Sequence, residues 1–159
     1  MVKSLIVFYS RTGRTKTVAH KLLELVQCDI EEIIDLKKRS GIAGFLGAGK
    51  DAALKRKTTI KEPEKQASDY DLLIIGTPIW AGNITPAIRT YIDKIRSHIN
   101  QTALFCTCSG KGNSTKAFME IEDLCGKKSL ATMEVTVKEL STGDYMGKLK
   151  RFADSLKII

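Results

Sequence analysis

The sequence predicts an α/β fold, in which five parallel strands form a doubly wound sheet with helices on both faces. Two observations support this prediction: short apolar runs alternate with amphipathic segments along the chain, and the 159 residues, 43% of them hydrophobic, suit one ordinary domain. Unbroken apolar runs are typical of parallel strands because helices cover both faces of such a sheet. Ligands of these sheets bind beyond the carboxyl ends of the strands.

Five segments have the character of strands. Leu5 to Phe8 and Leu72 to Ile75 are unbroken apolar runs, whereas the last segment alternates between apolar and polar residues. The expected strands are residues 3–9, 27–36, 71–76, 102–108 and 131–137.

The segments between these strands have helical periodicity. Val18, Leu22 and Val26 belong to one apolar stripe, and Pro86 suits the first turn of a helix with Thr85 as its cap. The expected helices are residues 15–26, 84–99, 113–124 and 144–156, with a further helix indicated by Ile42, Phe45 and Leu46.

Positive charge is concentrated in residues 37–66, which we call the basic insertion of a single domain spanning residues 1–159. The insertion has nine Lys or Arg and three acidic residues, an excess of six out of a net charge of +8. We expect Lys37, Lys38 and Arg39 to guide an acidic redox protein, and the alternative is a solvated polar face. We expect no nucleic-acid partner, because general basicity would not be confined to one insertion.

The apolar run Leu5 to Phe8 is too short for a secretory segment or a membrane span, so we expect a cytoplasmic protein with no membrane partner. The four cysteines form no C-x-x-C pair and have no histidines at ligand spacing, so we expect reduced thiols and no metal site. Cys106 and Cys108 should face the same side of a strand. They are either buried core residues or a redox dithiol near a cofactor.

The stretch GFLGAGKD, residues 44–51, matches seven of the eight positions of the G-x-x-x-x-G-K-[ST] phosphate loop. Asp51 stands where the hydroxyl should be, and the stretch does not directly follow a strand. We therefore interpret it as a Gly- and Ala-rich start of a helix.

The stretch SRTGRT, residues 10–15, lies directly between the first strand and the first helix. Its hydroxyls, its glycine and the amides of a helix N-terminus make an anion site, suited to a terminal phosphomonoester. The alternative is a Ser- and Thr-rich helix cap that binds no ligand.

SRTGRT resembles the [ST]-x-T-G-x-T phosphate loop of the flavodoxin family, and TPIWAGNITP (residues 77–86) and SGKGN (residues 109–113) resemble that family's two flavin-ring loops. The resemblance covers nearly the whole chain. It implies the strand order 2-1-3-4-5 and FMN as cofactor. The implied phosphate-binding residues are Ser10, Arg11, Thr12, Gly13, Arg14 and Thr15. The implied ring-binding residues are Thr77, Pro78, Ile79, Trp80, Ala81, Gly82, Ser109, Gly110, Lys111 and Asn113.

Trp80, the only tryptophan, is also a candidate for stacking on a flat cofactor by its position at a strand end. The alternative is a core or interface residue. Neither ring loop contains an acidic residue, and Lys111 lies in one of them. We therefore expect the bound flavin to be less reducing than in relatives whose ring is surrounded by carboxylates.

The resemblance implies an electron-transfer protein that cycles FMN between oxidised, semiquinone and hydroquinone states, and we expect this function with no catalytic side chain and no metal. The first alternative is an NAD(P)H-dependent FMN or quinone reductase, for which the basic insertion would have to build a nicotinamide pocket. The second is a binding protein for acidic polymers that only retains the fold, which would leave the three loops unexplained.

Overall fold

The structure, a computed structural model, describes residues 2–158 and contains the expected five-stranded sheet. All neighbouring strands are parallel and their order is β2-β1-β3-β4-β5, as predicted. The strands are β1 (Ser4–Phe8), β2 (Asp29–Glu32), β3 (Leu72–Pro78), β4 (Gln101–Cys108) and β5 (Thr132–Thr136).

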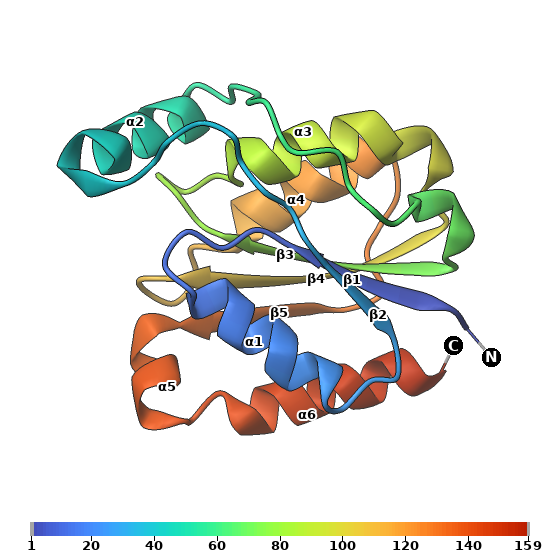
Figure 1. Ribbon diagram of the computed structural model, residues 1–159. Coiled ribbons are helices and arrows are strands. Elements are labelled where there is room, and N and C mark those ends of the chain that lie inside the picture. Colours follow the sequence, from blue (N-terminus) through green and yellow to red (C-terminus); the bar gives the residue numbers. More distant parts are fainter. Residues whose placement is uncertain (1, 159) are drawn as a thin grey trace.

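Helices cover both faces of the sheet (Figure 1). On one face lie α1, α5 and α6, and on the other lie α2, α3 and α4. The helices are α1 (Arg14–Leu23), α2 (Gly41–Ala53), α3 (Pro86–Ile95), α4 (Thr115–Cys125), α5 (Val137–Thr142) and α6 (Met146–Ser155). Short 3₁₀ turns occupy Ala67–Asp69, Arg96–His98 and Leu156–Ile158.

Two apolar clusters separate the sheet from its helices, one on each face. Leu73 and Leu104 pack toward α3 and α4, whereas Ile74 and Phe105 pack toward α1 and α6. Neighbouring residues of a strand thus belong to opposite clusters, because successive side chains of a strand point to opposite faces. The buried apolar runs of β1 and β3 follow from this sandwich.

The structure differs from the sequence prediction mainly at the ends of elements. β2 covers residues 29–32 rather than 27–36, because its neighbour in the sheet, β1, ends at Phe8, which pairs with Glu32. The first helix ends at Leu23 rather than Val26, and a 3₁₀ turn replaces the end of the helix expected over residues 84–99. The prediction missed α5, whose Thr136 and Glu139 form a capping box.

The basic insertion contains α2, so GFLGAGKD lies inside a helix rather than in a loop after a strand. This position rules out a phosphate loop of the G-x-x-x-x-G-K-[ST] type and confirms the interpretation as helix. Within residues 2–158, no helix combines the length and the apolar character that crossing a membrane requires.

Candidate functional site

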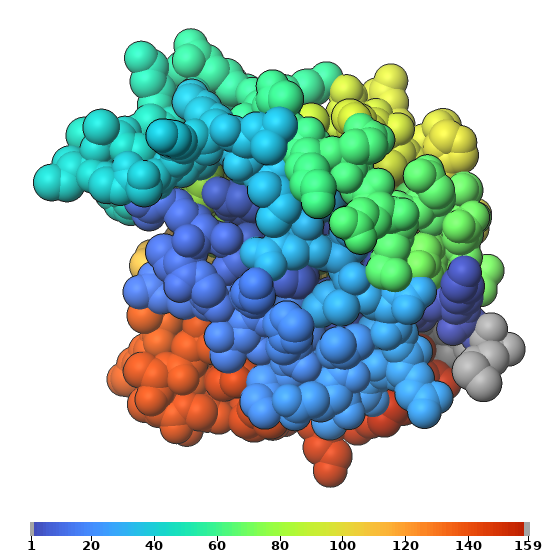
Figure 2. All heavy atoms as spheres, viewed as in Figure 1, coloured from blue at the N-terminus to red at the C-terminus, as the bar shows by residue number. Residues whose placement is uncertain are grey.

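A cavity of about 530 Å³ lies at the carboxyl ends of β3 and β4, next to the loop that follows β1. α2 projects beyond the body of the molecule and overhangs a recess on this side (Figure 2). The volume is in the range of pockets that hold cofactor-sized ligands. The cations Arg11, Arg14 and Lys50 line it, and none of the described residues that line it is acidic. Its charge therefore suits an anionic ligand.

The loop between β1 and α1 presents the N-terminus of α1 to this cavity. Gly13 is the N-cap residue and has φ = +89°, a conformation that glycine adopts without strain. Its amide donates to Ser10 Oγ at 3.1 Å, which closes the loop. The amides of the first turn have no partner within the helix, and no acidic residue lies in that turn. The loop thus has free donors and a favourable dipole for a phosphate.

Thr15 connects this loop to the sheet. Its side chain is buried, and its Oγ1 lies 2.8 Å from Oγ1 of Thr107 on β4. Thr107 was absent from the predicted site, although it lines the cavity beside Thr15. The hydroxyl pair fixes the start of α1 against the end of a buried strand.

The loop after β3 forms a tight two-residue hairpin. Trp80 and Asn83 exchange both backbone hydrogen bonds, at 3.0 and 2.9 Å, across Ala81 and Gly82. Ala81 and Gly82 have φ of +49° and +73°, as a type I′ turn requires. The base of the loop is fixed by Thr77, whose buried hydroxyl lies 3.3 Å from that of Thr85.

The Trp80 ring is partly buried in the cavity wall and contacts two other side chains. It meets the Tyr9 ring edge to face, with centroids 5.6 Å apart, and the Arg39 guanidinium lies 5.7 Å from its centre. Burial and the negative charge of Asp35 raise the pKa of Tyr9 to about 12, so the phenol stays neutral at physiological pH. These contacts hold the indole in one orientation at the cavity.

The loop after β4 is held by a carboxylate from the edge strand. Glu134 on β5 accepts hydrogen bonds from the amides of Gly112, at 3.0 Å, and Ser114, at 3.1 Å. Burial disfavours its charge, but hydrogen bonds from Ser114 and Gly112 outweigh that effect and lower the pKa of Glu134. The sequence analysis found no acidic residue in either ring loop, yet Glu134 brings a negative charge to this loop. Lys111 is exposed and is not part of the cavity wall.

α2 forms a second wall of the cavity, opposite the strand ends. Phe45, Leu46 and Lys50 line the cavity although they are exposed in this chain. Arg11 connects this wall to the loop between β1 and α1, because its Nε donates to the Arg39 carbonyl at 2.7 Å and its guanidinium lies 5.5 Å from the Phe45 ring centre.

A buried ion network fixes α2 in place. Arg39 donates to Asp35 at 2.5 Å and to Asp51 at 3.0 Å, and Asp51 also pairs with Lys37 at 2.5 Å and with Arg56 at 3.5 Å. The hydrogen bond from Lys37 lowers the pKa of Asp51. Arg39, expected to guide a partner, is only 6% exposed and serves this network instead. It was wrongly assigned to a docking surface because sequence gives charge but not burial.

The structure gathers most, but not all, of the predicted flavin ligands around the cavity. The predicted residues that line it are Arg11, Thr12, Arg14, Thr15, Pro78, Ile79, Trp80, Ala81 and Ser109. The predicted residues outside its lining are Ser10, Gly13, Thr77, Gly82, Gly110, Lys111 and Asn113. The lining residues that the prediction missed are Phe45, Leu46, Ala48, Gly49, Lys50, Thr107, Cys108 and Val137. In the sequence, only the apolar residues of the basic insertion, such as Phe45 and Leu46, could have indicated that α2 forms a wall of the cavity.

Comparison with solved structures identifies relatives of the fold. A flavoprotein in complex with FMN from Lactobacillus acidophilus NCFM has a TM-score of 0.73 at 22% identity, covering 89% of this chain and 98% of that one. Oxidised flavodoxin 1 from Bacillus cereus has a TM-score of 0.56 at 16% identity, covering 99% of both chains. A flavodoxin, WrbA-like protein from Agrobacterium tumefaciens has a TM-score of 0.57 at 14% identity, covering 97% of this chain and 96% of that one.

Residues 5–119, well over half of the chain, match the model of the NADPH-dependent FMN reductase family. The chain therefore belongs to this family. The flavodoxin-like fold inferred from the sequence is confirmed, whereas the family itself is the FMN reductase family. FMN, the cofactor implied by the three loops, is the flavin of the matched family, and this prediction is also confirmed.

Proposed function

We propose that this protein is an NADPH-dependent oxidoreductase that holds FMN in the 530 Å³ cavity and passes electrons to a small acceptor. The observation that carries the proposal is the place of α2: the basic insertion forms a cavity wall opposite the strand ends. A reductase, unlike a simple carrier, needs a pocket for the nicotinamide, and α2 is the element that would form this pocket. Membership of the FMN reductase family supports the same choice.

The residues around the cavity fit FMN. At one end, Thr12 and the first-turn amides of α1 would bind the phosphate, with Arg14 supplying positive charge. At the other end, Trp80 and the loop that Glu134 holds would orient the ring. When bound, the flavin supplies the redox chemistry, accepting a hydride from a nicotinamide and passing electrons on.

α2 gives the cavity the features that a second, anionic ligand needs. Phe45 and Leu46, which are 63% and 65% exposed, present apolar surface that a flat ring would cover. Lys50 lies on the same wall and offers a cation for a phosphate group of NADPH. The wall would thus exclude water from one side of the bound nicotinamide and attract its phosphates from the other.

Steady-state oxidation of NADPH by the purified chain with FMN, using a quinone as acceptor, tests this proposal. We expect turnover well above that of free FMN. Lys50→Gln should raise the KM for NADPH about fivefold, the equivalent of roughly 1 kcal/mol for an exposed charge pair, with the FMN affinity unchanged. Lys38→Gln is the matched control, because Lys38 lies on the same insertion but outside this cavity. An FMN-loaded protein that oxidises NADPH no faster than free FMN would exclude the proposal.

The second candidate is an electron carrier that receives electrons from an acidic redox protein. Two exposed side chains favour this candidate: Ile42, which is 82% exposed, and Lys38, which lies near the loop between β1 and α1. Lys37 is less available for docking because it pairs with Asp51. Arg39 has no part in such docking because it is buried. A carrier would show no NADPH oxidation of its own, and its electron-transfer rate with an acidic partner would fall as salt rises.

A further inference from the structure

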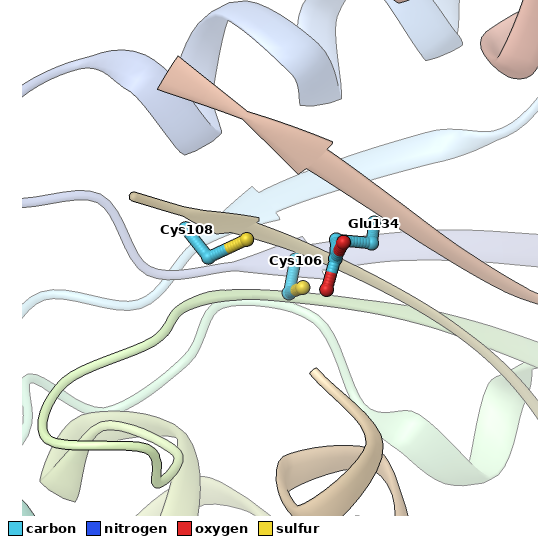
Figure 3. Close-up of side chains that lie close together, drawn as sticks. All are labelled: Cys106, Cys108 and Glu134. Atoms are coloured by element: carbon cyan, nitrogen blue, oxygen red, sulfur yellow. The ribbon is translucent and has the colours of Figure 1, made fainter. Parts of the chain in front are cut away.

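Cys106, Cys108 and Glu134 form a compact cluster beside the cavity, which Cys108 lines. Their sulfur atoms and a carboxylate oxygen all lie within 4.8 Å of one another. Figure 3 shows Cys106 and Glu134 turned toward each other, with the sulfur of Cys108 pointing into the same space. Glu134 holds the loop after β4 and Cys108 lines the cavity, but no step of the proposed reductase activity uses the two thiols.

The geometry of the sheet brings the three side chains together. Cys106 and Cys108 are two residues apart on β4, so both point to the same face, as the sequence predicted. Glu134 pairs directly with Cys106 in the β4–β5 register. The sequence analysis missed this residue because only the register of two strands, and not the spacing of cysteines, places it there.

The chemistry of the cluster is that of a ligand set for a thiophilic cation. Two thiols and one carboxylate are ligands that Zn²⁺ accepts, at about 2.3 Å for sulfur and about 2.0 Å for oxygen. Each Glu134 oxygen already accepts one backbone amide, from Gly112 or Ser114, and keeps a further lone pair. Hydrogen bonds of this kind orient carboxylate ligands in metal sites.

The surroundings give access to the pair of thiols. The Cys108 thiol lies at the end of β4, where it donates to the Gly110 carbonyl at 3.1 Å. Cys108 lines the 530 Å³ cavity, which provides a path from solvent to an otherwise buried pair.

We propose that Cys106, Cys108 and Glu134 bind a thiophilic divalent cation of the Zn²⁺ class. Binding replaces two thiol protons, which are released to solvent, by two sulfur–metal bonds, while the Glu134 carboxylate supplies a third ligand. The ion would connect the end of β4 to the edge strand β5 and so brace the loop that follows β4. Cys108 also lines the cavity proposed for FMN, but metal binding can be tested apart from the proposed reductase activity because it is measured without FMN or NADPH.

Titration of the reduced, metal-free full chain with Cd²⁺ tests the proposal through the sulfur-to-cadmium charge-transfer absorption. We expect one equivalent per chain, loss of that binding in Cys106→Ser and Cys108→Ser, and retention in Cys28→Ser and Cys125→Ser. The last two are matched controls because their thiols lie outside the cluster. Glu134→Gln should weaken Cd²⁺ binding by at least about tenfold, because losing a direct ligand should cost no less than losing an outer-shell partner.

An X-ray absorption measurement on the Zn²⁺-loaded wild type decides the question even if a variant fails to fold. Two sulfur neighbours at about 2.3 Å with oxygen in the remaining positions support the site, whereas a shell of only nitrogen and oxygen overturns it. Absence of stoichiometric Cd²⁺ binding in the wild type, or undiminished binding in both Cys106→Ser and Cys108→Ser, would also overturn it.

Discussion

The wall of the cavity formed by strand ends and the wall formed by α2 are fixed by different interactions. At the strand ends, buried strands carry the loops, and hydrogen bonds such as the one between the Thr15 and Thr107 hydroxyls align them. α2 is a 13-residue helix with four glycines, which are poor helix formers, and it leaves Ile42 82% exposed. Ions such as Arg39 and Asp51 hold it in place. The wall formed by strand ends therefore depends on the sheet and its hydrogen bonds, whereas the α2 wall depends on its charges.

The largest effect is expected from Asp51→Asn, which removes the shared anion of Lys37, Arg39 and Arg56. Arg39 keeps Asp35 as a partner but loses the charge-assisted hydrogen bond to Asp51, so unfolding free energy should fall by about 3 kcal/mol at neutral pH, the upper end for hydrogen bonds to charged groups. Urea unfolding measures this difference. Asp93→Asn, which removes only the surface pair with Lys57, should change stability little and is the matched control.

The same variant has a pH signature. The pKa of Asp51 is lowered in the folded protein, so its contribution is complete above the ordinary value of 3.8 and is lost as pH falls through the lower folded pKa. The stability difference between wild type and Asp51→Asn should therefore shrink below about pH 4. A difference that stayed constant down to pH 2 would show that Asp51 acts by packing rather than by charge.

Substitutions at two glycines of α2 distinguish the effect of helix propensity on stability from the effect of packing. A Cβ at Gly44 would lie 2.3 Å from the Arg39 carbonyl carbon, whereas a Cβ at Gly47 meets nothing within 4 Å. Gly44→Ala should destabilise the protein by about 2 kcal/mol through overpacking, and Gly47→Ala should stabilise it by up to about 1 kcal/mol. Thermal unfolding measures both variants. Equal effects of the two substitutions would mean that the chain before α2 does not pack on it as described.

The hydrogen bond between the Thr15 and Thr107 hydroxyls can be tested as a support of the wall formed by strand ends. Thr15→Val leaves the buried Thr107 hydroxyl without its partner, so we expect a loss of about 1.5 kcal/mol in unfolding free energy. The double variant with Thr107→Val should lose clearly less than the sum of the two single losses, because both partners are then apolar. Strict additivity in urea unfolding would contradict a direct hydrogen bond.

The smallest effect is expected for the indole ring. Trp80→Leu removes an aromatic contact worth roughly 1 kcal/mol, so the Kd for FMN should rise about fivefold. Trp80→Phe should retain most of the affinity. Because Trp80 is the only tryptophan, its emission reports directly on the site and should be quenched as FMN binds. Unchanged emission at saturating FMN would place the ring away from the cofactor.

Local patterns in the sequence were sufficient for the strand-end wall but not for the α2 wall. An apolar run followed by SRTGRT predicts an anion site at the end of β1, and the structure places this loop directly between β1 and α1, because loop, helix start and strand are contiguous in sequence. The contacts that position α2 join residues far apart, such as Lys37 and Asp51. Charge counts predicted a docking surface there, and the fold used Arg39 internally instead.

The sequence analysis also missed residues whose roles depend on contacts between neighbouring strands. Thr107 and Glu134 have no motif of their own, and their roles depend on the parallel register that sets β4 between β3 and β5. Once the strand order is known, both positions follow from the alternation of side chains along a strand. The sequence alone gave the order only through the resemblance of its loops to a known family.

The comparison of FMN and riboflavin affinities tests the central claim most directly, because the two ligands differ only in the phosphate. If Thr12 and the amides at the start of α1 bind that phosphate, two charge-assisted hydrogen bonds at about 1.5 kcal/mol each predict FMN affinity at least about a hundredfold higher. Equal affinities, measured by titration of the Trp80 emission, would contradict a phosphate site at this loop.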